Sequence, residues 1–262
     1  MNIPSRTSQA VALTRASFTR PHSLGGDPDA QRKLCEDMRF VPPPWLQPSI
    51  AARTRFVDEQ VVGAIADGVR QVVICGAGYD DRALRFRTAG VRYFELDHPA
   101  TQEDKARLLR RVGSRAGDVT LAEIDFRIDD VGAVLDLAGH EAEHRSLFVC
   151  EGLLVYLDRE TCHRLLTGLA ARASSGSMLA VSIAIHADGL DSAEVVATAN
   201  QRRRTGDTEP WQTILPAAEH LALIELAGWR IASIEQSPVA AADLTHGRRS
   251  LLVAAEVGTK SG

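Results

Sequence analysis

Apolar and polar residues follow two different patterns along this chain. Short runs rich in Val, Ile, Leu and Phe end at a glycine or an acidic residue, which is typical of strands buried on both faces of a parallel sheet. These runs predict strands at residues 71–74, 91–97, 119–126, 146–151, 178–185, 229–236 and 248–257. Because helical patterns separate most of the runs, they favour a doubly wound, mostly parallel α/β sheet.

Between the runs, apolar residues recur with the spacing of amphipathic helices. Helices are predicted at residues 8–20, 30–38, 50–67, 82–86, 99–109, 129–138, 158–173, 190–204 and 217–227. Prolines at positions 42, 43, 44 and 48 block regular structure after the second helix and indicate a hinge. We therefore expect an N-terminal helical cap at residues 1–48 and a ligand-binding α/β domain at residues 49–262.

The segment from Arg70 to Lys105 contains strand, glycine turn, helix, strand and acid within the length of one βαβ unit. Gly76-Ala77-Gly78 follows the first strand, and glycine at two of these positions lets a ligand approach the backbone closely. Asp97 ends the next strand, 19 residues after Gly78 (97 − 78). An acid at this spacing is typical of a residue that accepts hydrogen bonds from a ribose diol.

The charge of the glycine turn bears on the choice of nucleoside. A dinucleotide fingerprint places a third glycine where this chain has Asp81, next to Asp80. Two carboxylates at a helix start would repel a pyrophosphate, and they suit a cationic or zwitterionic ligand such as S-adenosylmethionine. The same two residues could instead cap the helix, which Asp does well. On charge, S-adenosylmethionine is favoured over NAD.

Four predicted strand ends carry a glycine or an acid, namely Gly78, Asp97, Asp125 and Glu151. In open α/β sheets, ligands lie beyond the carboxyl ends of the strands, near the point where the strand order reverses. The four residues are therefore expected to meet in one site. Asp125 could alternatively cap the following helix.

Three motifs in this order resemble the leucine carboxyl methyltransferase family, in its bacterial branch of S-adenosylmethionine-dependent O-methyltransferases. They are VVICGAGYDDRALRF, YFELDHPATQEDK and CEGLLVYL, and the resemblance covers residues 50–158 well and the rest loosely. It implies a Rossmann-like class I methyltransferase sheet with an antiparallel strand near the C terminus. It also implies N-terminal helices that cover the active site, which would place Arg15, Arg20 and Trp45 near the substrate.

The resemblance assigns roles to individual residues. It implies that Arg53 binds the carboxylate of the methionine moiety, as a planar guanidinium can do with two hydrogen bonds. It implies cofactor contacts for Glu151 and for Gly152 after it. It also places an acid and an apolar residue at the adenine, here Asp125 and Phe126. An exposed helix arginine remains the alternative for Arg53.

Two further residues complete the predicted site. His98 follows Asp97 and either faces the adenosine pocket or caps the strand end. Tyr156 lies in the LLVYL segment, which in the resembled family lines the methyl-transfer site, and it is the candidate catalytic residue that touches the acceptor. A half-buried tyrosine with a hydrated hydroxyl is the alternative for Tyr156.

Composition narrows the class of protein. The chain has 262 residues, 45% hydrophobic and 24% charged, which is ordinary for a soluble globular protein. A net charge of −4 argues against a nucleic-acid binder, and no run of ~18 apolar residues predicts a membrane span. The four cysteines form no CxxC pair, so no metal or redox site is expected, and a reduced, cytoplasmic protein is the simplest interpretation.

We therefore expect an S-adenosyl-L-methionine-dependent O-methyltransferase that acts on a carboxylate or hydroxyl of a small molecule, such as a secondary metabolite. The sequence names neither the acceptor nor the oligomeric state. An NAD-dependent oxidoreductase and a non-catalytic S-adenosylmethionine-binding protein are the alternatives. Asp81 departs from the small hydroxylated residue usual in the family, and the cap and lid regions are short, which leaves the acceptor open.

Overall fold

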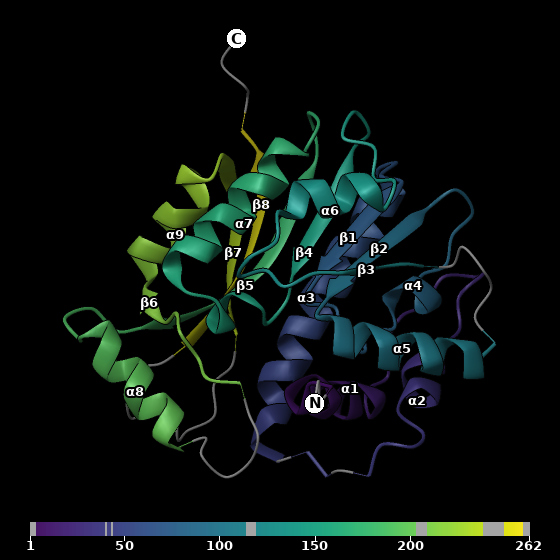
Figure 1. Ribbon diagram of the computed structural model, residues 1–262, viewed down its shortest axis with the longest axis horizontal. Helices are drawn as coiled ribbons and strands as arrows, with labels where there is room; N and C mark the ends of the chain where they lie inside the picture. The colour runs from purple at the N-terminus through teal and green to yellow at the C-terminus, as the bar shows by residue number, and fades with distance from the viewer. Residues whose placement is uncertain are drawn as a thin grey trace.

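The computed structural model describes residues 4–39, 41–42, 44–113, 119–202, 209–237 and 249–258, without the side chains of Trp45 and Arg202. Within these ranges a mixed sheet is flanked by helices on both faces (Figure 1). The strands are β1 (Gln71–Cys75), β2 (Arg92–Asp97), β3 (Thr120–Glu123), β4 (Ser146–Cys150), β5 (Met178–His186), β6 (Leu215–Pro216), β7 (Trp229–Ser237) and β8 (Arg249–Val257).

The strand order is β3-β2-β1-β4-β5-β8-β7, and β6 pairs with β5 outside this path. Strands β1, β2, β3, β4 and β5 are parallel to one another, whereas β8 runs antiparallel to both of its neighbours, β5 and β7. The predicted Rossmann-like sheet with an antiparallel strand near the C terminus is therefore confirmed. The strand order reverses between β1 and β4, where Ile74 pairs with Val149.

The helical segments connect these strands and add a group of helices at the start of the chain. They are α1 (Arg6–Ala16), α2 (Ala30–Leu34), η1 (Pro44–Leu46), α3 (Gln47–Ala66), α4 (Arg82–Arg85), α5 (Pro99–Arg111), α6 (Val131–Leu137), η2 (Leu154–Tyr156), α7 (Arg159–Ala171), α8 (Ser192–Arg202) and α9 (Ala217–Leu226).

The predicted first helix and third strand have different bounds in the structure. Helix α1 begins at Arg6 because the hydroxyl of Ser5 accepts a hydrogen bond from the N–H of Ser8 (3.2 Å). It ends at Ala16, after which the backbone no longer follows the helix. Strand β3 stops at Glu123 because the chain turns at Asp125, whose N–H donates to the Asp129 carboxylate (2.7 Å).

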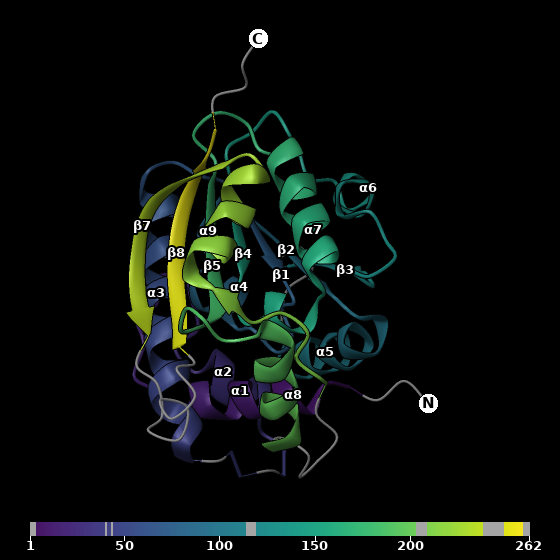
Figure 2. The ribbon, with the colours of Figure 1, turned by 90° about the vertical axis from the view of Figure 1, so that its left-hand side faces the viewer.

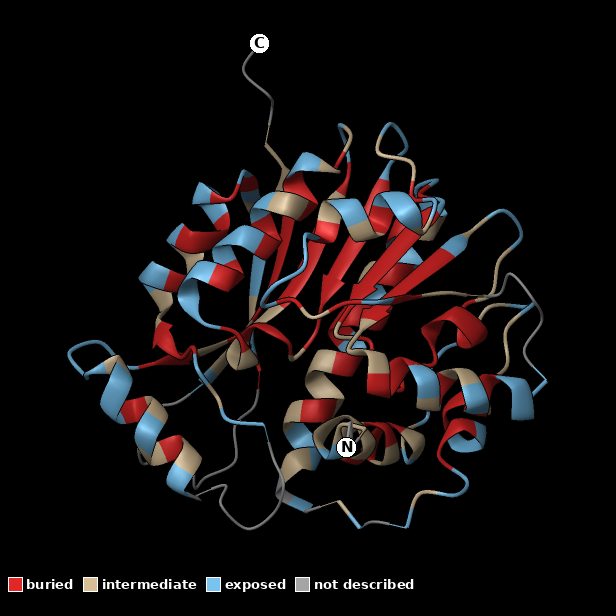
Figure 3. Cartoon of the chain, viewed as in Figure 1, coloured by how far each residue is buried: buried red, intermediate tan, exposed pale blue. Residues whose placement is uncertain are grey.

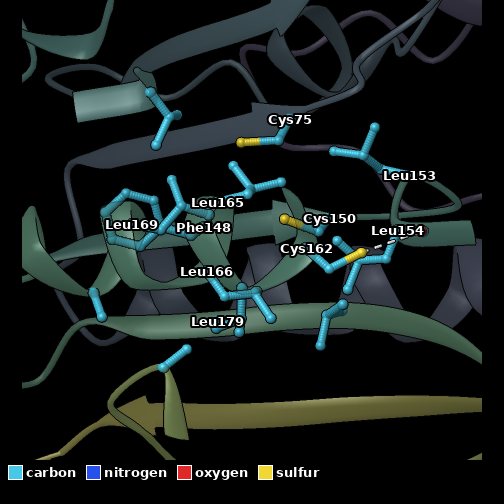
Figure 4. Packing of buried hydrophobic residues seen from close by; sticks show 14 of the residues in the cluster. Cys75, Phe148, Cys150, Leu153, Leu154, Cys162, Leu165, Leu166, Leu169 and Leu179 are labelled. Carbon is cyan, nitrogen blue, oxygen red and sulfur yellow. Dashed lines mark hydrogen bonds between the residues drawn. The ribbon is translucent and has the colours of Figure 1, made fainter. Parts of the chain in front are cut away.

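Successive residues of β1 face opposite sides of the sheet, as the pleat requires. Val72 and Ile74 pack in a cluster with α3 on one face. Val73 and Cys75 pack on the other face in the cluster that includes residues of α7, part of which Figure 4 shows. The parallel strands near the middle of the sheet are buried throughout (Figure 3), which explains their uninterrupted apolar runs.

Helices α1 and α2 lie with the start of α3 at the edge of the sheet where the parallel strands end, and α8 lies at the same edge (Figures 1 and 2). Ala12 of α1 and Leu34 of α2 are buried in one cluster with Tyr79 and Leu84, which follow β1. The cap region is thus attached to the glycine turn. Its division from the rest of the chain at residue 48 stays a prediction. No helix within the described ranges is both long and apolar enough to cross a membrane.

Candidate functional site

A cavity of about 530 Å³ lies beyond the carboxyl ends of β1, β2, β4 and β5. Its walls come from the strand ends, from α1, from the start of α3, from η2 and from residues 209–212. All eleven site residues predicted from the sequence line this one cavity: Arg53, Gly76, Ala77, Gly78, Asp97, His98, Asp125, Phe126, Glu151, Gly152 and Tyr156. The structure therefore brings the predicted residues together, while the role of each stays a prediction.

The glycine turn after β1 has a backbone that an ordinary side chain would strain. Gly76 and Gly78 have φ values of 67° and 51°, in the left-handed region. A Cβ atom on Gly78 would lie only 2.8 Å from the Cβ of Ser8 in α1. Because position 78 has no side chain, α1 can pack closely against the glycine turn. The same lack of a side chain would let a ligand approach the backbone of the turn.

Asp97 joins the end of β2 to this turn. Its two carboxylate oxygens accept hydrogen bonds from the N–H groups of Gly78 and His98, each at 2.7 Å. Burial raises the pKa of Asp97 above its ordinary value, against the opposing effect of these two backbone hydrogen bonds. Each oxygen keeps a second lone pair, so the carboxylate can hold the turn and still accept hydrogen bonds from a ribose diol.

Of the two aspartates predicted to face a ligand, Asp80 lines the cavity and Asp81 does not. Asp80 also accepts a hydrogen bond from the N–H of Arg82 (2.8 Å), as the capping alternative predicts. Both side chains are buried, and each is paired with one arginine nearby in the sequence and one from α1 or the segment after it. Asp81 binds Arg20 (2.6 Å) and Arg85 (2.7 Å), and Asp80 binds Arg15 (3.2 Å). Burial alone would raise the pKa of Asp81, but Arg20 and Arg85 lower it to about 2. Since both carboxylates are paired with arginines, the sequence argument from two uncompensated charges at the helix start does not apply.

Glu151, at the end of β4, is surrounded by three guanidinium groups. It contacts Arg15 (2.6 Å), Arg53 (2.9 Å) and Arg82 (3.0 Å). Burial would raise the pKa of Glu151, but the three arginines hold it well below its usual range. Arg53 uses its Nε for this contact, and its Nη atoms lie 3.1 and 3.3 Å from the position of a Cβ on Gly152. The strand end thus fixes Arg53 at the cavity wall.

The structure separates the three N-terminal residues expected near the substrate. Arg15 lines the cavity and joins Asp80 to Glu151. Arg20 is instead bound to Asp58 (2.8 Å) and Asp81, in the buried network beneath the turn. The side chain of Trp45 lies outside the described part of the chain.

Asp125 and Phe126 form the wall beyond β3. The carboxylate of Asp125 binds Arg127 (2.6 Å), and this hydrogen bond lowers the pKa of Asp125. Phe126 is largely buried but lines the cavity, and its carbonyl accepts a hydrogen bond from Arg164 of α7 (3.0 Å). Asp125 and Phe126 thus both line the cavity, and the carboxylate of Asp125 is also paired with Arg127.

The wall above β4 and β5 contains residues beyond the eleven predicted ones, from the turn-rich segment 205–216, whose sequence suggests a lid loop and whose residues 205–208 lie outside the described part of the chain. Residues 209–212 line the cavity, and the Gln212 side chain donates to the carbonyl of Tyr156 (2.8 Å). Asn200 of α8 holds Trp211 from behind through two hydrogen bonds. The tryptophan in a turn-rich segment was a visible signal for this wall, but an asparagine on a helix carries no pattern that predicts such a contact.

Comparison with known proteins places this geometry in a family. The model of the leucine carboxyl methyltransferase family matches residues 9–170. A Streptomyces coelicolor protein, provisionally named as an S-adenosyl-L-methionine-dependent methyltransferase, is 40% identical over 138 residues, 52% of this chain and 48% of that protein. A Mycobacterium sp. (strain JLS) protein with the same kind of name is 33% identical over 217 residues, 79% of this chain and 68% of that protein. The matched segments thus span about half to two thirds of these relatives.

Solved structures share the fold at low sequence identity. A Thermobifida fusca protein, provisionally named a methyltransferase, has a TM-score of 0.60 at 14% identity and covers 98% of this chain and 96% of its own. The magnesium protoporphyrin IX methyltransferase of Synechocystis PCC 6803 with bound SAH has a TM-score of 0.56 at 16% identity, covering 88% and 94%. These structures show the shared fold. Because the family model covers more than half of the chain and the Mycobacterium relative is 33% identical over 79% of it, this chain belongs to the leucine carboxyl methyltransferase family.

Proposed function

We propose that this protein is an S-adenosyl-L-methionine-dependent O-methyltransferase that acts on a carboxylate or hydroxyl of a small molecule, as in secondary metabolism. The observation that carries the proposal is the convergence of eleven residues on one cavity at the switch point between β1 and β4. Ligands of open α/β sheets bind at this place. Family membership and the names of the relatives support the choice of cofactor.

The residues present fit such a cofactor. Asp97 has lone pairs left for a ribose, and Arg53 presents Nη atoms at the wall for the methionine carboxylate. Glu151 lines the cavity, and its negative charge would attract the ammonium group of the methionine moiety. Asp125 would accept from the adenine amine while Phe126 packs on the ring. The bound cofactor would supply a methyl group already activated on a positively charged sulfur.

The protein's contribution is then binding, alignment and exclusion of water. Helix α1 and residues 209–212 wall the cavity from two sides. Tyr156 lines the cavity, which supports the expectation that it touches the acceptor. Among the described lining residues, His98 is the only histidine. A carboxylate acceptor is ionised at neutral pH and needs no base, whereas a phenol would pass its proton to His98 or to water. A carboxylate acceptor therefore suits this lining better than a phenol, because its methylation requires no base.

Calorimetric titration with S-adenosylhomocysteine, with NADH as the control ligand, tests the cofactor. We expect micromolar binding of S-adenosylhomocysteine and none of NADH. Asp97→Ala should weaken this binding by ~1–3 kcal/mol, the usual cost of leaving buried polar partners unpaired. Asp136→Ala, on the exposed side of α6, is the matched control and should bind like the wild type.

Two results would overturn parts of the proposal. Binding of NADH without S-adenosylhomocysteine would favour an oxidoreductase. Binding of S-adenosylhomocysteine without transfer of a labelled methyl group to any carboxylic acid or phenol would favour a non-catalytic binding protein. Asp97→Asn, which keeps one acceptor oxygen for the glycine turn, separates loss of the ribose contact from loss of the fold.

A further inference from the structure

The backbone of Trp211, at the cavity wall, is bound by the side chain of Asn200 of α8. The amide of Asn200 donates to the carbonyl of Trp211 (2.8 Å) and accepts from its N–H (2.8 Å). One residue thus satisfies both backbone groups of Trp211, in the two-hydrogen-bond manner that a planar amide permits. Because Asn200 sits on a helix, the position of Trp211 follows the position of α8.

The backbone on the other side of Trp211 is fixed as well. The N–H of Gln212 donates to the carbonyl of Val155 (2.7 Å), and the Thr213 hydroxyl donates to the carbonyl of Leu157 (2.5 Å). Both acceptors belong to the segment around η2, which follows Glu151. Trp211 is therefore fixed between α8 and the η2 segment, and it forms a built part of the wall.

The side chains at this end of the cavity are mainly apolar. Trp211 packs with Val155 and Ala184 on a buried cluster formed by Val195, Ala199 and Ile214. Trp211, Val155 and Ala184 also line the cavity, as do Leu46 and Ile50 from the opposite, N-terminal side. The charged residues Asp97 and Glu151 lie instead at the ends of β2 and β4, beside the glycine turn, and Arg15 of α1 contacts Glu151. We call the part of the cavity lined by Val155, Ala184 and Trp211 the apolar half, and Glu209 lines the cavity two residues before Trp211.

We propose that the apolar half binds the non-reacting body of the acceptor, that this body is a flat apolar ring system packed against Trp211, and that Asn200 is the positioning residue for this contact. The inference rests on the proposed function, because it names the substrate class of the same site. An indole offers a large, rigid apolar face, and aromatic pairs gain more than their buried area alone provides. A wall fixed by Asn200 on one side and η2 on the other favours a rigid ring over a flexible chain.

Calorimetry with two probe acids tests the inference, with and without saturating S-adenosylhomocysteine. The probes are 2-naphthoate, a flat bicyclic acid, and hexanoate, a flexible chain with the same carboxylate. We expect 2-naphthoate to bind more tightly than hexanoate. Trp211→Ala and Asn200→Ala should each weaken 2-naphthoate about tenfold or more, while Trp211→Phe keeps most of the affinity. The affinity for S-adenosylhomocysteine should stay within about twofold of wild type in all three variants.

Two controls separate positioning from a loss of structure. Gln201→Ala changes an exposed neighbour of Asn200 on the same helix and should leave 2-naphthoate binding unchanged. The difference between the emission spectra of the wild type and Trp211→Phe isolates the Trp211 signal from the other two tryptophans. In Asn200→Ala this signal should move to longer wavelength, because the indole is no longer held in the wall.

The outcomes are distinct. Equal binding of 2-naphthoate by the wild type and Trp211→Ala, equal affinity for both probes, or no binding of 2-naphthoate would each overturn the inference. If S-adenosylhomocysteine still binds in these cases, the proposed function stands without the aromatic acceptor. If S-adenosylhomocysteine does not bind but 2-naphthoate binding depends on Trp211, the proposed function fails and the apolar site remains.

Discussion

Single charged residues beneath the glycine turn illustrate how a local pattern can mislead. Asp80 and Asp81 sit next to each other after Gly78, where they look like charges presented to a ligand. In the fold they are buried, and their partners Arg15 and Arg20 come from more than 60 residues earlier in the chain. Long-range ion pairs leave no periodic signal in the sequence, so the share contributed by Arg15 and Arg20 could not be predicted. The local pair of Asp81 with Arg85, four residues later, is one that the sequence does offer.

The pairing of Asp81 predicts how stability depends on pH. Its folded pKa of about 2 lies below the ordinary value of 3.8, so the pair contributes stability above about pH 4 that is lost as pH falls toward 2. The shift corresponds to about 2 kcal/mol. Asp81→Asn should cost about 3–5 kcal/mol at neutral pH, because it leaves Arg20 and Arg85 buried with one partner fewer.

Urea denaturation at pH 6, 4 and 3 measures this effect. The difference in free energy of unfolding between the wild type and Asp81→Asn should shrink as pH falls below 4. Asp136→Asn, which removes an exposed ion pair with Arg172, should cost less than ~1 kcal/mol at every pH. A difference for Asp81→Asn that stays constant from pH 6 to 3 would contradict the assignment.

At the scale of elements, the contact between α1 and the glycine turn decides how the cap closes on the sheet. The Cβ of Ser8 lies 2.8 Å from the position of a Cβ added to Gly78, and Gln9 donates to the hydroxyl of Tyr79 (3.4 Å). The sequence predicted a glycine turn for ligand approach and a separate cap. The structure adds that the same glycine makes room for the cap helix.

Gly78→Ala should therefore cost more than the strain of its backbone alone. A residue with a Cβ at positive φ costs ~1–2 kcal/mol. Gly90→Ala is the matched control, because Gly90 has a φ of 78° and no atom within 4 Å of the added Cβ. We expect a further ~1–3 kcal/mol for Gly78→Ala from the clash with Ser8.

The double variant Gly78→Ala/Ser8→Gly separates the two costs. Ser8→Gly carries a cost of its own as a glycine within α1. Measured against that single variant by chemical denaturation, the added Gly78→Ala should cost close to Gly90→Ala, because the clash is removed. Equal costs for the two single glycine variants would mean that α1 does not depend on this contact.

At the scale of the whole molecule, the cavity is bounded by segments from both ends of the chain. Helix α1 and the start of α3 line one side, and residues 209–212 line the other. A ligand in the cavity would join the cap to the strand ends, whereas the edge strand β7 lies elsewhere on the sheet. Ligand binding should thus stabilise some parts of the protein more than others.

Hydrogen exchange should show this difference. If the bound ligand must leave before α1 can open, the ligand reduces the open population in proportion to its saturation. S-adenosylhomocysteine at 100 times its Kd should then slow exchange of the α1 amides about 100-fold. Peptides of β7 that exchange through local fraying should change little, and NADH should have no effect on either. Equal slowing in α1 and β7, or none in α1, would argue against a ligand beneath the cap.

The sequence by itself determined the order of the elements and the chemistry of the strand ends. Hydrophobic runs, a glycine turn and the acid at position 97 are local patterns, and parallel strands must bring their carboxyl ends to one edge. These rules suffice to place Gly78, Asp97, Asp125 and Glu151 in one cavity.

The tertiary structure alone decided which charges remain available and what forms the far wall. Arg15, Arg53 and Arg82 surround Glu151, and Asn200 reaches Trp211, through contacts between segments that share no sequence pattern. The physical reason is that ion pairs and single amide contacts depend on side chains meeting in space. Periodicity reports which face a residue occupies, but it does not report its partner.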